Sequence, residues 1–125
     1  MIFGIGTDII EIKRIHKILN KHKNSFISKI FTDNEIENGN NKKSAVTYFA
    51  GRWAAKEAFS KALGTGIGKN CSWKDIEIRN SESGNPYCLL SGDAEKTSES
   101  NGIVNIHLSI SHEQEYATAT VILEK

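Results

Sequence analysis

Three charged residues with side chains suited to phosphate chemistry stand at two places in the chain. Asp8 lies in the apolar stretch "GIGTDIIEI" (residues 4–12), and Glu57 and Lys61 lie one helical turn apart near the middle. If Asp8 and Glu57 converge, two carboxylates with no clustered His or Cys form a site of hard oxygen ligands, which suits Mg²⁺. Lys61 would then neutralise charge on a transferred phosphate or a leaving group. The three residues together predict metal-assisted phosphoryl chemistry.

Asp8 is an unexpected residue at its position. Alternating apolar residues predict a β-strand over residues 2–12, and both faces of that strand are largely apolar. An unpaired buried carboxylate would be strongly destabilising or would take up a proton. We therefore expect a backbone N–H group, a basic side chain or a metal ion to contact Asp8.

Glu57 and Lys61 also have a simpler interpretation. An acid followed by a base four residues later is the favourable order for a surface ion pair on a helix. However, Phe49 and Trp53 precede Glu57 in steps of four residues, which places Glu57 at the border of the helix's apolar side. Lys56 and Lys61 both flank it. The spacing alone leaves both interpretations open.

Glycines and a histidine supply two weaker signals. The loop "GTGIGK" (64–69) is not a phosphate-binding Walker A motif, because it ends an expected helix instead of opening one. Its glycines fit a helix C-cap and a flexible loop, although free N–H groups at Gly64 and Gly66 would also suit a phosphate. His112 ends an expected strand, where a lone histidine is more often a capping or surface residue than a catalyst.

Length and composition limit the class of protein. The chain has 125 residues, 38% hydrophobic residues and a net charge of +1, which fits one globular domain over residues 1–125. We find no apolar run of membrane-spanning length and no signal peptide. The two cysteines match neither a zinc pattern nor a disulfide framework. We therefore expect a cytoplasmic protein with reduced thiols and no membrane partner.

A basic segment stands out from the nearly neutral chain. Residues 13–23, "KRIHKILNKHK", contain five Lys or Arg residues, two His and no acid, and their apolar residues recur at helical spacing. The charges form either a solvated helix face or a docking surface for an acidic partner. Nucleic acid is the less favoured partner, because the segment has no aromatic residue for base stacking.

Helix and strand signals follow one another without a regular βαβ alternation. We expect strands at 2–12, 72–80, 86–90, 104–112 and 116–124, helices at 13–23, 44–63 and before Gly102, short helices and turns over 24–40, and a loop at 38–43. Ser44 is the expected N-cap of the long helix, and Gly64 is its expected C′ residue. The order predicts an α+β fold, with a mainly antiparallel sheet packed on a long central helix.

Three stretches, in this order and spacing, resemble one family. They are "GIGTDIIEIKRI", "FAGRWAAKEAFSKALGTGIG" and "SISHEQEYATATVILE", with "SGNPYCLLSGDA" between the last two. They resemble the holo-acyl-carrier-protein synthases, the short group of 4′-phosphopantetheinyl transferases. The resemblance implies Mg²⁺-dependent transfer of the phosphopantetheine arm of coenzyme A to a serine of apo acyl carrier protein, for fatty acid biosynthesis. It also implies release of adenosine 3′,5′-bisphosphate, and a homotrimer with active sites at subunit interfaces.

The resemblance also implies roles for individual residues. Asp8 and Glu57 would hold Mg²⁺, Glu57 would act as the base, and Lys61 would neutralise the leaving phosphate. Ile10 stands where longer transferases have a middle carboxylate, so water would fill that coordination position. The coenzyme A contacts would be Arg52, Lys56, Gly64, Gly66 and His112. The acidic carrier protein would dock on Arg14, Lys17 and Lys21.

Two functions of other classes remain open from the residues. A non-catalytic adaptor would bind acidic proteins through residues 13–23 and would tolerate Asp8→Asn and Glu57→Gln. A metal-dependent phosphohydrolase would use the same carboxylates to cleave coenzyme A without an acceptor.

Overall fold

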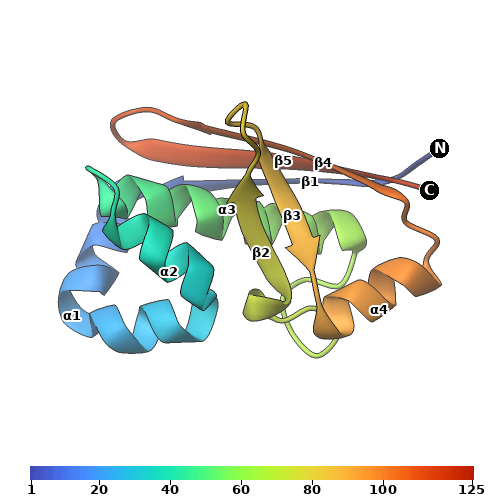
Figure 1. Cartoon of the computed structure of the whole chain (residues 1–125), viewed down its shortest axis with the longest axis horizontal. Coiled ribbons are helices and arrows are strands. Elements are labelled where there is room, and N and C mark those ends of the chain that lie inside the picture. The colour runs from blue at the N-terminus through green and yellow to red at the C-terminus, as the bar shows by residue number, and fades with distance from the viewer.

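A three-stranded antiparallel sheet forms one layer of the molecule (Figure 1). The computed structural model describes all residues 1–125, and the strand order is β1-β5-β4. These strands are β1 (Ile2–Glu11), β4 (Asn105–His112) and β5 (Tyr116–Glu124). A separate antiparallel hairpin joins β2 (Ile76–Asn80) to β3 (Pro86–Leu90). The predicted α+β class and the mainly antiparallel pairing are confirmed.

The long helix α3 (Ala45–Leu63) packs along the sheet and forms the centre of the core. Its buried residues lie on almost every side, as in a helix that other elements surround. The Ser44 hydroxyl accepts a hydrogen bond from the N–H of Thr47, and Gly64 ends the helix in the left-handed conformation, with φ of 89°. Both predicted caps are confirmed.

Two glycines let β1 lie directly against α3. A Cβ atom on Gly6 would be 1.9 Å from the carbonyl oxygen of Ala58, and one on Gly4 would be 2.1 Å from that of Ala62. Only glycine permits so close an approach of two backbones. The "GIGTD" stretch is therefore pressed onto the last turns of α3, and Asp8 lies beside that helix.

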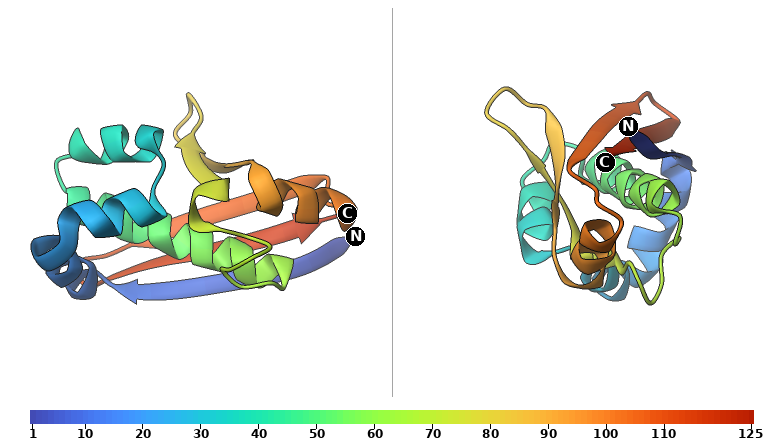
Figure 2. Two further views of the ribbon diagram at one scale, coloured as in Figure 1. Left: turned by 90° about the horizontal axis from the view of Figure 1, so that it is seen from below. Right: turned by 90° about the vertical axis from the view of Figure 1, so that its right-hand side faces the viewer.

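The remaining helices cover the same face of the sheet and the ends of α3 (Figure 2). They are α1 (Ile12–Ile30), α2 (Asp33–Asn40), a 3₁₀ turn (Trp73–Asp75) and α4 (Gly92–Ser100). No helix combines the length and the apolar character needed to cross a membrane.

Two predicted boundaries are wrong, and a third is close. α1 extends to Ile30, but non-helical dihedral angles at His22 divide it into two helices next to the predicted end at residue 23. The second of these helices packs Phe26 against Trp53 at 5.7 Å between ring centroids. α2 extends to Asn40 through part of the expected loop, after a complete capping box of Thr32 and Glu35. The strand expected from residue 72 begins only at Ile76, because a second capping box opens the 3₁₀ turn.

The outer face of the sheet has no helix against it. Ile5 and Ile9 of β1 are 65% and 63% exposed, and Ile5 pairs with Ile122 of β5. Large apolar residues that gather on one face of a sheet are normally covered. This face is therefore suited to contact with another protein surface.

The first and last residues lie side by side at one corner of the sheet (Figure 2). The amine of Met1 donates a hydrogen bond to the carbonyl oxygen of Lys125 at 2.8 Å. The N–H of Lys125 donates in return to the carbonyl oxygen of Met1, also at 2.8 Å.

Candidate active site and ligand groove

Asp8 and Lys61 meet where β1 crosses the end of α3. The Lys61 ammonium donates to Asp8 Oδ1 at 3.1 Å and to the carbonyl oxygen of Thr7 at 3.0 Å. The Asp8 side chain is 18% exposed, whereas that of Lys61 is 50% exposed. Of the three partners expected for Asp8, the structure contains the basic side chain.

Glu57 shares the electrostatic environment of this pair. Burial raises the pKa of Glu57, the negative charge of Asp8 raises it further, and the positive charge of Lys61 opposes both effects. Lys61 forms its ion pair with Asp8, so the simple Glu57–Lys61 surface pair is not the contact that the fold makes. The fold therefore brings Asp8 and Lys61 into contact and places Glu57 within reach of the charges of both.

The donor atoms at this place fit a magnesium ion. Asp8 and Glu57 offer carboxylate oxygens, and no group of three or more His, Cys, Asp or Glu side chains surrounds a common point. Mg²⁺ commonly binds to one or two carboxylates and takes its other ligands from water and substrate phosphates. Ile10, two residues after Asp8, is 6% exposed and belongs to the core, so it supplies no third ligand.

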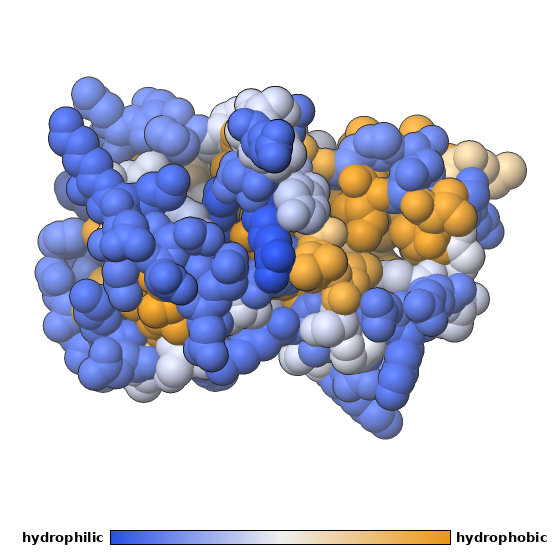
Figure 3. Space-filling model, viewed as in Figure 1, coloured by the Kyte–Doolittle hydropathy of each residue, from blue (hydrophilic) through white to orange (hydrophobic).

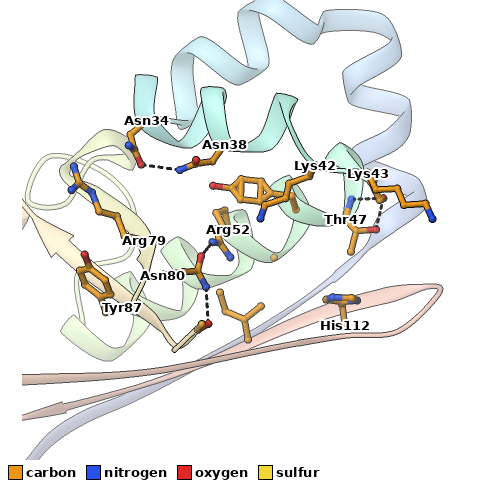
Figure 4. Close-up of a pocket in the computed structure, with 15 residues that line it drawn as sticks. Asn34, Asn38, Lys42, Lys43, Thr47, Arg52, Arg79, Asn80, Tyr87 and His112 are labelled. Carbon is orange, nitrogen blue, oxygen red and sulfur yellow. Dashed lines mark hydrogen bonds between the residues drawn. The ribbon is translucent and has the colours of Figure 1, made fainter. Parts of the chain in front are cut away.

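A polar groove of about 810 Å³ opens on the opposite side of α3 (Figure 4). Arg52 and His112, which come from α3 and the end of β4, both line it. The groove is further lined by Asn34, Asn38, Lys42, Lys43, Ser44, Thr47, Tyr48, Gly51, Arg79, Asn80, Gly84, Tyr87 and Ile110. Basic groups, amides and two tyrosines in one concavity suit a ligand with phosphates and an aromatic ring.

Arg52 is held in place with part of its hydrogen-bonding capacity unused. Its guanidinium lies 4.3 Å from the centre of the Tyr48 ring and donates to the side-chain oxygen of Asn80. The Nε of Arg52 and the hydroxyl of Tyr48 are buried without a hydrogen-bond partner.

Lys42, Lys43 and Arg79 are groove residues that the sequence did not single out. The two lysines stand just before the N-terminus of α3, and "NNKKS" before a predicted helix was the available signal. Arg79 had no local signal, because only the packing of the β2–β3 hairpin brings it to the groove.

Lys56 requires a correction. It was expected to bind coenzyme A, but its side chain is 0% exposed. The ammonium donates to Glu35 at 2.6 Å and to the carbonyl oxygens of Ile30 and Trp73 at 2.8 and 3.0 Å. These three bonds use every ammonium hydrogen, so Lys56 has none left for a ligand.

Gly64 and Gly66 lie outside the groove, at the C-terminal end of α3. The N–H groups of both residues donate to the carbonyl oxygen of Ser60, at 3.1 Å each. A phosphate cradle of free N–H groups is therefore not formed, because the helix cap uses these two. A contact between this loop and coenzyme A stays a prediction.

The carboxylate cluster and the groove are separate in one chain. Arg52 and Glu57 are five residues apart on α3, which corresponds to a rotation of about 140° around the helix. The residues that line the groove include neither Asp8, Glu57 nor Lys61. The groove of one chain therefore does not include the carboxylates of that chain.

The basic segment forms the first half of α1, and Arg14, Lys17 and Lys21 are all exposed there. The Arg14 guanidinium lies 5.6 Å from the centre of the Trp53 ring, which holds it near α3.

Figure 3 shows that polar residues cover most of the α1 and α2 side of this view, whereas apolar residues gather beside the hairpin, over β3 and β4.

Comparison with characterised proteins gives consistent matches over the whole chain. The family model for the 4′-phosphopantetheinyl transferase superfamily matches residues 4–121. The holo-[acyl-carrier-protein] synthase of Vibrio parahaemolyticus is 46% identical over 123 residues, which are 98% of each chain. That of Halothermothrix orenii is 45% identical over 125 residues, covering 100% of this chain and 99% of the relative.

Solved structures agree with these matches. The holo-[acyl-carrier-protein] synthase of Neisseria meningitidis superposes with a TM-score of 0.95 at 39% identity, over 100% of both chains. That of Bacillus anthracis, in complex with CoA (3′,5′-ADP), superposes with a TM-score of 0.83 at 46% identity and covers 98% of this chain and 96% of its own. With its fold, its carboxylate cluster and these relatives in agreement, the chain belongs to the 4′-phosphopantetheinyl transferase superfamily.

Proposed function

We propose that this chain is a holo-[acyl-carrier-protein] synthase. It transfers 4′-phosphopantetheine from coenzyme A to a serine of apo acyl carrier protein and releases adenosine 3′,5′-bisphosphate. The contact of Lys61 with Asp8, beside Glu57, carries the proposal, because two carboxylates and a cation are groups suited to phosphate chemistry. Full-length relatives that bear this name support it.

Asp8 and Glu57 would hold a Mg²⁺ ion, which when bound supplies positive charge against the pyrophosphate oxygens. In our proposal, Glu57 accepts the proton of the carrier serine hydroxyl. The serine oxygen bonds to the phosphorus that bears the pantetheine arm, and the bond from that phosphorus to the oxygen of the leaving nucleotide breaks. Lys61 stabilises the negative charge on the leaving phosphate.

We infer that the groove holds the nucleotide part of coenzyme A. Lys42, Lys43 and Arg79 offer cations for phosphates, and Arg52 and His112 lie among them (Figure 4). The tyrosines and amides suit an adenine ring. Relatives crystallised in complex with coenzyme A, from Bacillus anthracis and Helicobacter pylori, support the co-substrate.

The separation of groove and carboxylates supports a site shared between subunits. In this proposal the groove of one subunit faces Asp8 and Glu57 of a neighbour in a homotrimer. The uncovered outer face of the sheet, with Ile5 and Ile9 exposed, supplies apolar surface for that contact. The acidic carrier protein docks on Arg14, Lys17 and Lys21 in the cytoplasm, as a step of fatty acid biosynthesis.

The decisive experiment is the intact mass of an apo acyl carrier protein after incubation with this protein, coenzyme A and Mg²⁺. We expect a gain of one phosphopantetheine, which is lost with a chelator and with Asp8→Asn. Asp93→Asn, at an exposed position of α4, is the matched control and should keep full activity.

Each other result points to a different function. Intact coenzyme A with an unmodified carrier would contradict the transferase proposal and favour the adaptor. Cleaved coenzyme A with an unmodified carrier would favour the phosphohydrolase.

A further inference from the structure

Glu35 and Lys56 form an ion pair in the interior of the protein that the proposed chemistry does not use. Both side chains are 0% exposed, and Lys56 Nζ lies 2.6 Å from Glu35 Oε1. Glu35 stands in the first turn of α2, and Lys56 stands on α3 next to Glu57 but directed toward the core. Burial lowers the pKa of Lys56, while the negative charge of Glu35 raises it and so opposes that effect.

Every polar atom of this pair has a backbone or side-chain partner from a different element. Glu35 Oε1 also accepts from the N–H of Thr32 at 2.9 Å, and Oε2 accepts from the N–H of Ile78 in β2 at 2.8 Å. Lys56 donates to the ends of α1 and the 3₁₀ turn through Ile30 and Trp73. One pair of side chains therefore connects α1, α2, α3, the 3₁₀ turn and β2.

Stability alone gives a weak reason for such a pair. Apolar side chains of similar volume often replace a buried ion pair with no loss of stability. An apolar pair cannot, however, accept from the N–H groups of Thr32 and Ile78, nor donate to the carbonyl oxygens of Ile30 and Trp73. The pair is thus suited to fixing the relative positions of backbone segments.

The segments that it fixes are walls of the groove. Asn34 precedes Glu35 in α2, and Arg79 follows Ile78 in β2. Both Asn34 and Arg79 line the groove. A second link joins the same two elements nearer the surface, where the Thr32 hydroxyl donates to Glu77 at 2.5 Å. The spacing of α2 and β2 across the groove therefore depends on hydrogen bonds that converge on Glu35.

We propose that Glu35 and Lys56 act as a positioning pair, which holds α2 and β2 at the separation that the groove needs to bind the nucleotide of coenzyme A. This inference rests on the proposed function of the groove. Neither residue lines the groove, and both side chains are fully buried, so their loss should change binding without changing the chemical step.

The test compares Glu35→Gln, Lys56→Met and the double variant with the unsubstituted protein. Calorimetry measures the Kd for adenosine 3′,5′-bisphosphate and for coenzyme A, and steady-state kinetics separate KM from kcat. We expect each single variant to raise the Kd for both ligands by about tenfold, while kcat at saturating coenzyme A changes less than about twofold. Because the two residues act as one unit, the double variant should weaken binding by less than the product of the singles.

Leu123→Ala is the matched control, because Leu123 is buried in β5 and the groove does not include it. It should lower the melting temperature and leave Kd unchanged. Equal Kd values for Glu35→Gln and the unsubstituted protein would overturn the positioning role, as would strictly multiplicative single effects. Failure of the unsubstituted protein to bind either ligand would instead overturn the proposed function of the groove.

Hydrogen exchange on the unsubstituted protein provides a second measurement that does not depend on a variant folding. The N–H groups of Thr32 and Ile78 should exchange slowly without ligand, and coenzyme A should change their rates little, because the pair is already formed. Exchange of either group as fast as at the exposed N–H groups of Glu82 and Ser83 would overturn the proposal.

Discussion

At the scale of residues, Asp8 and Lys61 depend on each other. Asp8 is accommodated in an apolar strand because the ammonium of Lys61 approaches it from α3. Lys61→Met keeps the length of the side chain and removes its charge. We expect kcat to fall by about 10- to 100-fold, since the leaving phosphate loses its cation, while KM for coenzyme A changes little. Lys96→Met on exposed α4 is the control, and an unchanged kcat in Lys61→Met would contradict the role of Lys61.

The two cysteines should be unreactive in the folded chain. Burial raises the pKa of Cys71 to about 11 and that of Cys88 to about 12. Thiolate is the reactive form, and at pH 8 about one molecule in a thousand or fewer carries it at either residue. Mass spectrometry after iodoacetamide treatment should detect no adduct on the native protein and two adducts in urea. Rapid labelling of the native protein would show that the interior opens readily.

At the scale of elements, the contact between β1 and α3 sets the geometry of the carboxylate cluster. Gly6→Ala would place a methyl group only 1.9 Å from the carbonyl oxygen of Ala58, so β1 and α3 would have to move apart. We expect a loss of about 3 kcal/mol in the free energy of unfolding, measured in urea. A methyl group at Gly68 would meet nothing within 4 Å, so Gly68→Ala should stay within about 0.5 kcal/mol. Equal stability of the two variants would mean that β1 moves away from α3 at little cost.

Charges on the first half of α1 should affect the binding of the carrier protein and not that of coenzyme A. Arg14→Glu and Lys17→Glu reverse exposed charges that are outside the nucleotide groove. We expect each to raise KM for the carrier by about fivefold at low salt and less at high salt, with an unchanged Kd for coenzyme A. Lys17→Glu separates charge from the contact that Arg14 makes with Trp53. Unchanged carrier kinetics in both variants would contradict docking on this helix.

Local signals predicted the elements whose causes are local. Ser44 caps the start of α3 and Gly64 caps its end, as expected, since a cap depends on a few neighbouring residues. Asp8 drew attention for the same reason, as a charge in an apolar strand. The burial of Lys56 and the arrival of Arg79 at the groove could not be predicted, because both depend on how α2 and the β2–β3 hairpin pack from distant parts of the chain.

At the scale of the whole molecule, the proposed shared site makes a distinctive prediction. Asp8→Asn damages the carboxylate side and Arg52→Ala damages the groove, so each variant should be nearly inactive alone. In trimers assembled from both variants, about one quarter of the interfaces combine two intact sides. Co-expressed variants should therefore recover about a quarter of the full activity. Activity no greater than that of the separate variants would indicate a site within one subunit.

The pairing of Met1 with Lys125 has a practical consequence for handling the molecule. A surface tether or a fluorescent label attached to either terminal residue would be located at the same corner of the sheet, on the opposite side from α1 in Figure 1. Immobilisation through either end should therefore present the helical surface in one orientation. The same adjacency would let a short peptide join the two ends and new ends be opened at exposed Lys69 and Asn70, which gives a circular permutant with the same sheet.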